Sequence, residues 1–188
     1  MIRAFAALLL ALCLASCATV PSRSPEVEAK LLQANESLDR LNEEIAEFHE
    51  RVQMVRLDIQ ELYRHPGWPE MQEIIEFMQT AAGEGNMPEG GVEIEQVGAA
   101  WSEKYGEPWE MMFARYLMLV KSCSELEAKR LSLQSRLLSV QGQFLGASVM
   151  AYSSGRHSQG QSIDAVVHIL ARSGEELEAY TVNSLGLY

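Results

Sequence analysis

An unbroken heptad pattern constrains the fold of this chain more than any other feature. Alternating steps of four and three residues meet an apolar side chain every time, at Val27, Leu31, Ala34, Leu38, Leu41, Ile45, Phe48, Val52, Val55, Ile59 and Leu62. This spacing places all of them on one stripe of an α-helix, as in the seam of a coiled coil. At about 1.5 Å per residue the helix would be roughly 50 Å long, and a stripe of that length needs a partner.

A second long helix is predicted from about residue 108 to 151. One charged residue, Arg130, interrupts its stripe, which otherwise consists of Trp109, Met112, Tyr116, Leu119, Cys123, Leu126, Leu133, Leu137, Val140, Phe144 and Ala147. The same helix carries a second apolar rib, made of Phe113, Leu117, Val120, Leu131, Leu138 and Leu145. Two apolar ribs on one helix predict contacts with at least two neighbours.

The two long helices, about 25–64 and 108–151, match in length. We therefore predict an all-α fold, a long antiparallel coiled-coil-like helical hairpin with short accessory helices. The alternative is a parallel homodimer through the first long helix, which the β-branched residues at one heptad position favour, namely Ile45, Val52 and Ile59.

The hairpin predicts a partner for Arg130. If Leu62 faces Trp109, the register brings Arg130 within reach of Glu43 or Glu44. A carboxylate there would offset the cost of a half-buried guanidinium. We therefore expect an Arg130–Glu44 ion pair between the long helices.

Shorter helices are expected in two places. The insertion 65–107 lies between the long helices, where Pro66 and Pro69 break the chain. The segment 152–162 reads as a loop, and C-terminal helices are predicted at about 162–184. Ser162 is the expected cap of the first, and Ser173 with Glu176 has the capping-box spacing for the second. These C-terminal helices are the expected cover for the second rib.

Trp68, Trp101 and Trp109 all lie in or beside the insertion. One interpretation is a small core at the tip of the hairpin. The other is a partner-binding patch, because Trp is enriched in protein interfaces.

The charge balance argues against several functions. The chain has 26 acidic and 15 basic side chains and no basic run, so nucleic acid is not an expected partner. Asp164 and His168 share a helix face, but two ligands four residues apart are common, so no metal and no other cofactor is expected. No catalytic motif is recognised, and an enzyme is not expected.

The first sixteen residues read as a secretory leader. Arg3 supplies a positive charge, an apolar run follows from Ala4 to Leu14, and small residues come next. The run is too short to span a bilayer as a mature helix.

The end of the leader resembles the lipobox of bacterial lipoproteins, on the residues Leu14-Ala15-Ser16-Cys17. This resemblance implies cleavage of residues 1–16, a lipid on Cys17 and a tether over 17–24. It also implies a body on the far side of the inner membrane. Since Ala18 is not the Asp that retains such proteins in the inner membrane, the outer membrane is favoured, with the body facing the periplasm.

Cys123 is the one cysteine outside the leader and its cleavage site. It is expected either as a buried thiol that packs as a small hydrophobe, or in an intermolecular disulfide in the oxidising periplasm.

These features together predict a single helical domain over residues 25–188, held at a membrane by the lipid. The favoured function is a structural spacer or adaptor, a protein-interaction module for an envelope protein partner, with a homodimer as a further expectation. The alternative is a helical binding module or chaperone for a peptide, an unfolded protein or a lipid.

Overall fold

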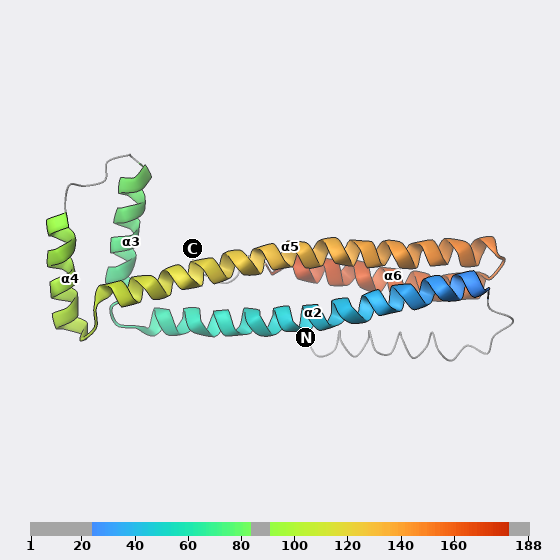
Figure 1. The fold of residues 1–188 in the computed structure, drawn as a ribbon, viewed down its shortest axis with the longest axis horizontal. Coiled ribbons are helices and arrows are strands. Elements are labelled where there is room, and N and C mark those ends of the chain that lie inside the picture. The colour runs from blue at the N-terminus through green and yellow to red at the C-terminus, as the bar shows by residue number, and fades with distance from the viewer. Residues whose placement is uncertain (1–23, 84–90, 181–188) are drawn as a thin grey trace. The chain divides into compact units, whose positions relative to one another are not determined.

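The computed structural model describes residues 24–83 and 91–180, and this part of the chain contains helices and no β-strand. The helices are α2 (Pro25–Arg64), α3 (Trp68–Gly83), α4 (Gly91–Tyr105), α5 (Trp109–Ser153) and α6 (His157–Glu178) (Figure 1). The all-α prediction is confirmed, and both long helices lie within two residues of their predicted bounds. The leader, Cys17 and its tether fall outside the described residues.

Glycine sets the ends of two helices. Gly106, after α4, and Gly155, after α5, have φ values of 76° and 74°, a conformation that L side chains rarely adopt. At the end of α5 the amide of Gly155 donates to the carbonyl of Tyr152, and the amide of Arg156 donates to that of Ala151. This pair of bonds is a Schellman motif, which reverses the chain into α6.

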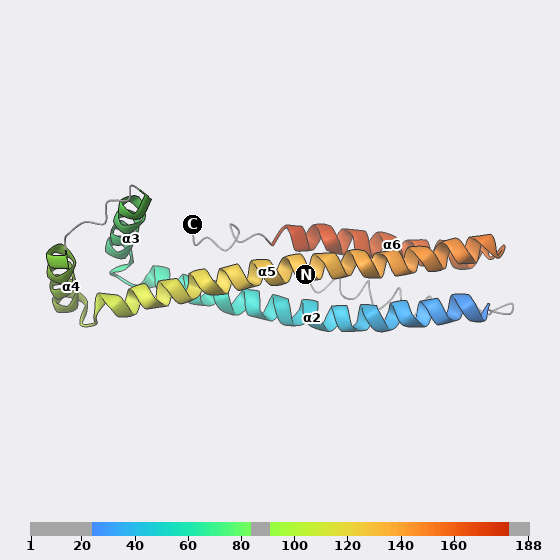
Figure 2. The same cartoon turned by 45° about the horizontal axis from the view of Figure 1, so that its top comes forward.

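The described residues divide into two compact units. In unit 1, residues up to His49 of α2 and from Glu127 of α5 form a three-helix core with α6. Figures 1 and 2 both show α6 running alongside α5. Its buried apolar residues recur every seven positions, at Ile163, Leu170 and Leu177.

Unit 2 consists of the described residues from Glu50 to Leu126, with α3, α4 and the adjoining parts of α2 and α5. Two ion pairs join α2 and α5 here, Arg51 with Glu125 at 2.6 Å and Arg115 with Glu61 at 2.7 Å. The numbers rise along α2 as they fall along α5, so the two helices are antiparallel in this unit.

The heptad stripes form the core of both units. Nine of the eleven stripe residues of α2 are buried, and Leu31 and Ile45 are half-buried. On α5 every predicted stripe residue is buried except Trp109, which is half-buried. The stripe of α2 is therefore covered within each unit. The expectation of one domain over 25–188 stays a prediction.

The predicted C-terminal helices are one helix. It begins at His157, so most of the expected loop 152–162 is helical. The hydroxyl of Ser162 donates to the carbonyl of Ser158, and that of Ser173 donates to the carbonyl of Ile169. Both serines thus donate to carbonyl groups of α6 itself and do not cap new helices. The capping prediction was wrong because this backward hydrogen bond competes with capping.

The prediction that C-terminal helices cover the second rib of α5 is also wrong. Leu131, Leu138 and Leu145 are each more than half exposed. Instead, α6 packs beside Ser148, which is buried, and a Cβ at Gly174 would lie 3.3 Å from the side chain of Leu137. Small residues thus let α6 pack closely beside the stripe of α5, with Ser148 on α5 and Gly174 on α6.

The expected Arg130–Glu44 ion pair is not formed. Arg130 is buried and pairs with Glu127, one turn earlier on its own helix. Glu44 pairs instead with Lys129, at 2.8 Å, and with Arg136. Arg130 donates two hydrogen bonds to the carboxylate of Glu127, from Nε and from one terminal nitrogen, so its charge is paired within α5 without a carboxylate from α2.

Candidate functional site

Trp68 begins α3 and lies inside unit 2, with 6% of its surface exposed. Its ring centroid is 5.3 Å from that of Tyr63 and 5.9 Å from that of Tyr116. The ring therefore joins α2, α3 and α5, and truncating it would remove core contacts.

Trp101, on α4, is 2% exposed and covers the turn between α2 and α3. It stacks on His65, with centroids 6.3 Å apart, and contacts Tyr105 at 4.5 Å. A Cβ at Gly67 would clash with this indole, so glycine is required where the turn meets the ring. His65 is itself fixed, since its Nδ1 accepts the Gly67 amide at 3.1 Å and its Nε2 lies 3.1 Å from Glu107 Oε1.

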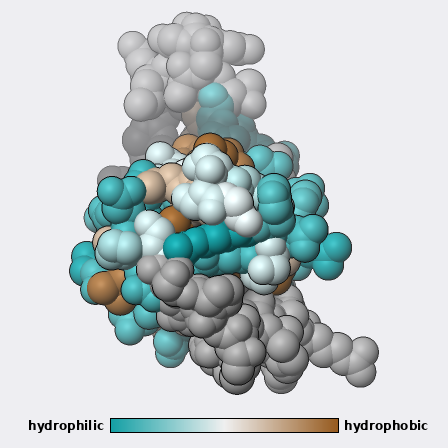
Figure 3. Space-filling model, turned by 90° about the vertical axis from the view of Figure 1, so that its right-hand side faces the viewer, coloured by the Kyte–Doolittle hydropathy of each residue, from teal (hydrophilic) through white to brown (hydrophobic). Residues whose placement is uncertain are grey.

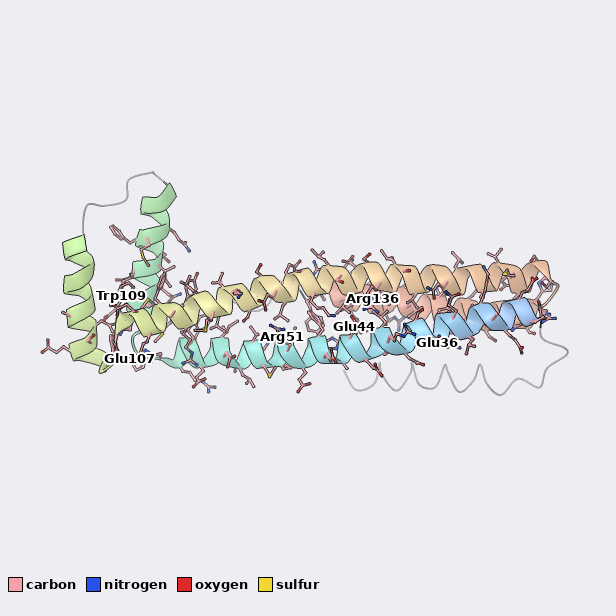
Figure 4. All side chains as sticks on the ribbon, viewed as in Figure 1. Glu36, Glu44, Arg51, Glu107, Trp109 and Arg136 are labelled. Carbon is pink, nitrogen blue, oxygen red and sulfur yellow. The ribbon has the colours of Figure 1, made fainter. Side chains whose placement is uncertain are left out.

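Trp109 is half-buried at the start of α5 (Figure 4). It lies against Gly98 of α4, where a Cβ would come within 2.7 Å of the indole, and its centroid is 5.9 Å from that of Phe113. The structure thus places the three tryptophans among side chains of unit 2, with two of them buried. The core interpretation fits Trp68 and Trp101, whereas Trp109 is half-buried.

The exposed apolar residues of unit 2 are different ones. Sequence reasoning did not single them out as a site, because single exposed hydrophobics are common on any surface. They lie on α2, α3 and α5: Met54, Leu57, Tyr63, Phe77, Met111, Leu117 and Met118. These side chains, unlike the buried tryptophans, are accessible to a partner.

Asp164, a candidate ligand by sequence, is the acceptor of a hydrogen-bond network in unit 1. Its Oδ1 accepts from the hydroxyl of Ser148, and its Oδ2 accepts from Tyr152 at 2.8 Å. The hydrogen bond from Ser148 is the larger cause, and that from Tyr152 the next, of a carboxyl pKa below its ordinary value. A carboxylate held by two hydroxyls is a structural acceptor that ties α6 to α5.

His168 is exposed, and among residues 24–83 and 91–180 no group of three or more His, Cys, Asp or Glu side chains could hold a metal. Figure 3 shows the end of unit 1 where α5 passes into α6, and mainly hydrophilic residues lie there. None of the helices in the described part is both long and apolar enough to cross a membrane.

Cys123 is fully buried and its thiol is free. Burial raises the pKa of the thiol, which disfavours the thiolate that disulfide exchange needs. The structure therefore agrees with the packed-thiol interpretation of this residue.

Glu44 forms a cluster of three charged side chains in unit 1 with Lys129 and Arg136. Its carboxylate lies between Lys129 and Arg136, and Figure 4 shows it directed toward Arg136. The hydrogen bond from Lys129, followed by that from Arg136, lowers its pKa. All three side chains are partly exposed, so the cluster adds specificity to the α2–α5 pairing more than stability.

No known protein family, curated protein or solved structure matches this chain. Its function is therefore argued from its own residues.

Proposed function

We propose that this protein is a lipid-anchored module of the bacterial cell envelope that binds another envelope protein. In this proposal the lipid on Cys17 holds the chain at the outer membrane, and the helical body faces the periplasm. Several acyl chains would suffice as an anchor, since each buried methylene contributes about 0.8 kcal/mol. The body would need no membrane-binding surface of its own.

The observation that carries the anchor is the tetrapeptide Leu14-Ala15-Ser16-Cys17, which directly follows the apolar run of the leader. An apolar run and a cleavage motif at that spacing are what a lipoprotein signal requires. The acidic composition supports an anchor of this kind, because a chain of net charge −11 gains nothing from anionic lipid head groups.

The exposed hydrophobic residues support the binding role. Phe77, Met111 and Met118 of unit 2 are each more than half exposed. Aromatic residues and Met are enriched in interfaces, and Met adapts to partners of different shape. We assign the docking site to these exposed side chains in place of Trp68 and Trp101, with Trp109, the one half-buried tryptophan, as a further candidate.

A photo-cross-linking residue placed at Phe77, Met111 or Met118 in cells tests the docking site. We expect the same partner band from at least two of these positions. Gln72, which is exposed and lies about 140° around the same helix from Phe77, is the control and should give no band. Absence of a band from all three positions, in protein that fractionates with membranes, would exclude a stable partner at this surface.

The second candidate, a binding module for peptides, unfolded chains or lipid, predicts a different result. The purified body would suppress aggregation of an unfolded client at stoichiometric amounts, and the cross-linked products would be heterogeneous. A single discrete product favours the adaptor.

A further inference from the structure

A second heptad stripe runs along the outside of α5 in unit 1. Steps of three and four residues lead through exposed positions only: Ala128, Leu131, Ser135, Leu138, Gly142, Leu145 and Val149. We call this set the outer stripe. Its four larger members are each more than half exposed. No residue of the described chain covers it, and a Cβ at Gly142 would meet nothing within 4 Å.

The outer stripe itself carries no charge, and two carboxylates at its border have partners: Glu127 pairs with Arg130, and Glu178 of α6 accepts from Gln134. The residues beside it on α5 include Ser132, Gln134, Ser139 and Gln141, and no charged residue occurs between Arg136 and Arg156. An exposed helix face of a strongly acidic chain would ordinarily carry Glu and Lys. Because the stripe residues themselves are uncharged, two copies can approach here although the chain is strongly acidic.

The stripe is also complementary to itself in shape. One heptad position is always leucine (Leu131, Leu138, Leu145), and the other is small or β-branched (Ala128, Ser135, Gly142, Val149). In an antiparallel pair the two positions face each other, so each leucine meets a smaller residue. In a parallel pair like residues would meet, and Gly142 opposite Gly142 would leave a void.

We propose that the outer stripe of α5 is a homodimer interface, in which a second copy packs antiparallel against Ala128–Val149. This seam differs from the homodimer expected through α2, whose stripe is already buried. A two-fold pair of identical helices is the commonest closed arrangement for a self-complementary surface.

The size of the stripe sets the expected strength. It is about 33 Å long and about 10 Å wide, which gives each copy roughly 300–400 Å² of contact. Standard stable interfaces bury about 800 Å² per partner. The dimer should therefore be weak and reversible, with subunits exchanging on dilution.

The test is the mass in solution of the mature chain, residues 17–188 with Cys17→Ser, by sedimentation equilibrium from about 1 µM to about 1 mM. We expect a monomer–dimer equilibrium within this range. Leu138→Glu should weaken it about tenfold or more, because it buries a carboxylate at the seam. Leu32→Glu is the matched control: Leu32 is 62% exposed and Leu138 is 63% exposed, both in unit 1.

A chain that stays monomeric throughout would overturn the proposal. So would a dimer that Leu138→Glu leaves intact, or that both glutamate variants weaken equally. Orientation is read from a nitroxide label at position 149 in a Cys123→Ala background. The antiparallel pair places the labels roughly 25–40 Å apart, whereas a parallel pair would hold them about 10 Å apart.

Discussion

Tyr152 of α5 donates its phenolic hydrogen to Oδ2 of Asp164 on α6, across 2.8 Å. The buried hydroxyl of Ser148 donates to the other carboxylate oxygen. These two bonds join the helices on either side of the Gly155 turn. They tie the first turns of α6 to the last turns of α5.

The network should make unit 1 sensitive to acid. The hydrogen bonds lower the pKa of Asp164, so its stabilising effect is present above the ordinary carboxyl pKa of about 4 and is lost as the pH falls through the lowered value. Asp164→Asn should lower the urea midpoint at about pH 7 and converge with the wild type at about pH 2. A difference between the two proteins that is equal at both pH values would contradict this role.

Two helical glycines should respond to alanine in opposite ways. A Cβ at Gly160 would come within 2.7 Å of the Tyr152 ring, whereas one at Gly146 would meet nothing within 4 Å. Gly160→Ala should lower the melting temperature, since the ring must leave Asp164. Gly146→Ala should stabilise by roughly 0.5–1 kcal/mol through helix propensity. Thermal melts in dilute solution compare them, and equal shifts would count against the packing of Tyr152 on α6.

The stripe of α2 predicts a sharp contrast between two leucines. Leu41 is fully buried in the core of unit 1, and Leu32 lies on the exposed side of the same helix. Leu41→Ala should cost about 2–5 kcal/mol in the free energy of unfolding, and Leu32→Ala less than about 0.5 kcal/mol. Chemical denaturation measures both, and similar costs would mean that the α2 stripe is not the core.

The Arg130–Glu127 pair predicts an asymmetry between its two partners. Arg130 is buried while Glu127 is about one-third exposed. Glu127→Gln should destabilise by roughly 1–3 kcal/mol, because it leaves a buried guanidinium without its carboxylate. Arg130→Met fills the same space without a charge and should cost less. If Arg130→Met lowered the free energy of unfolding more than Glu127→Gln, the stabilising contacts of Arg130 would lie outside the ion pair.

The long helices could be predicted from the sequence because apolar residues at heptad spacing share one face only if the chain is helical. Pro66 and Gly106 marked where they break, and the bounds of α2 were predicted to the residue. The partner of Arg130 was missed because a residue three positions away on the same helix satisfies a guanidinium as well as one across the seam.

The features around α6 were not predictable in the same way. Ser148 and Tyr152 meet Asp164 only once α6 has folded back on α5, and no spacing in the sequence indicates that contact. Leu131, Leu138 and Leu145 read as core by their hydrophobicity, yet they are exposed because α6 packs on the face of Ser148. The three tryptophans lie in or beside the insertion, but residue type alone does not distinguish a tryptophan of the core from one that contacts a partner.

The lipid anchor is tested by the mass of the N-terminal tryptic peptide of protein taken from the membrane fraction. We expect a peptide from Cys17 to Arg23 that carries a covalent lipid, with residues 1–16 removed. Cys17→Ser should keep its leader and yield no lipidated peptide. A wild-type peptide that begins at Cys17 or later without lipid would exclude the anchor, and so would the peptide Ala4–Arg23, which requires an uncleaved leader.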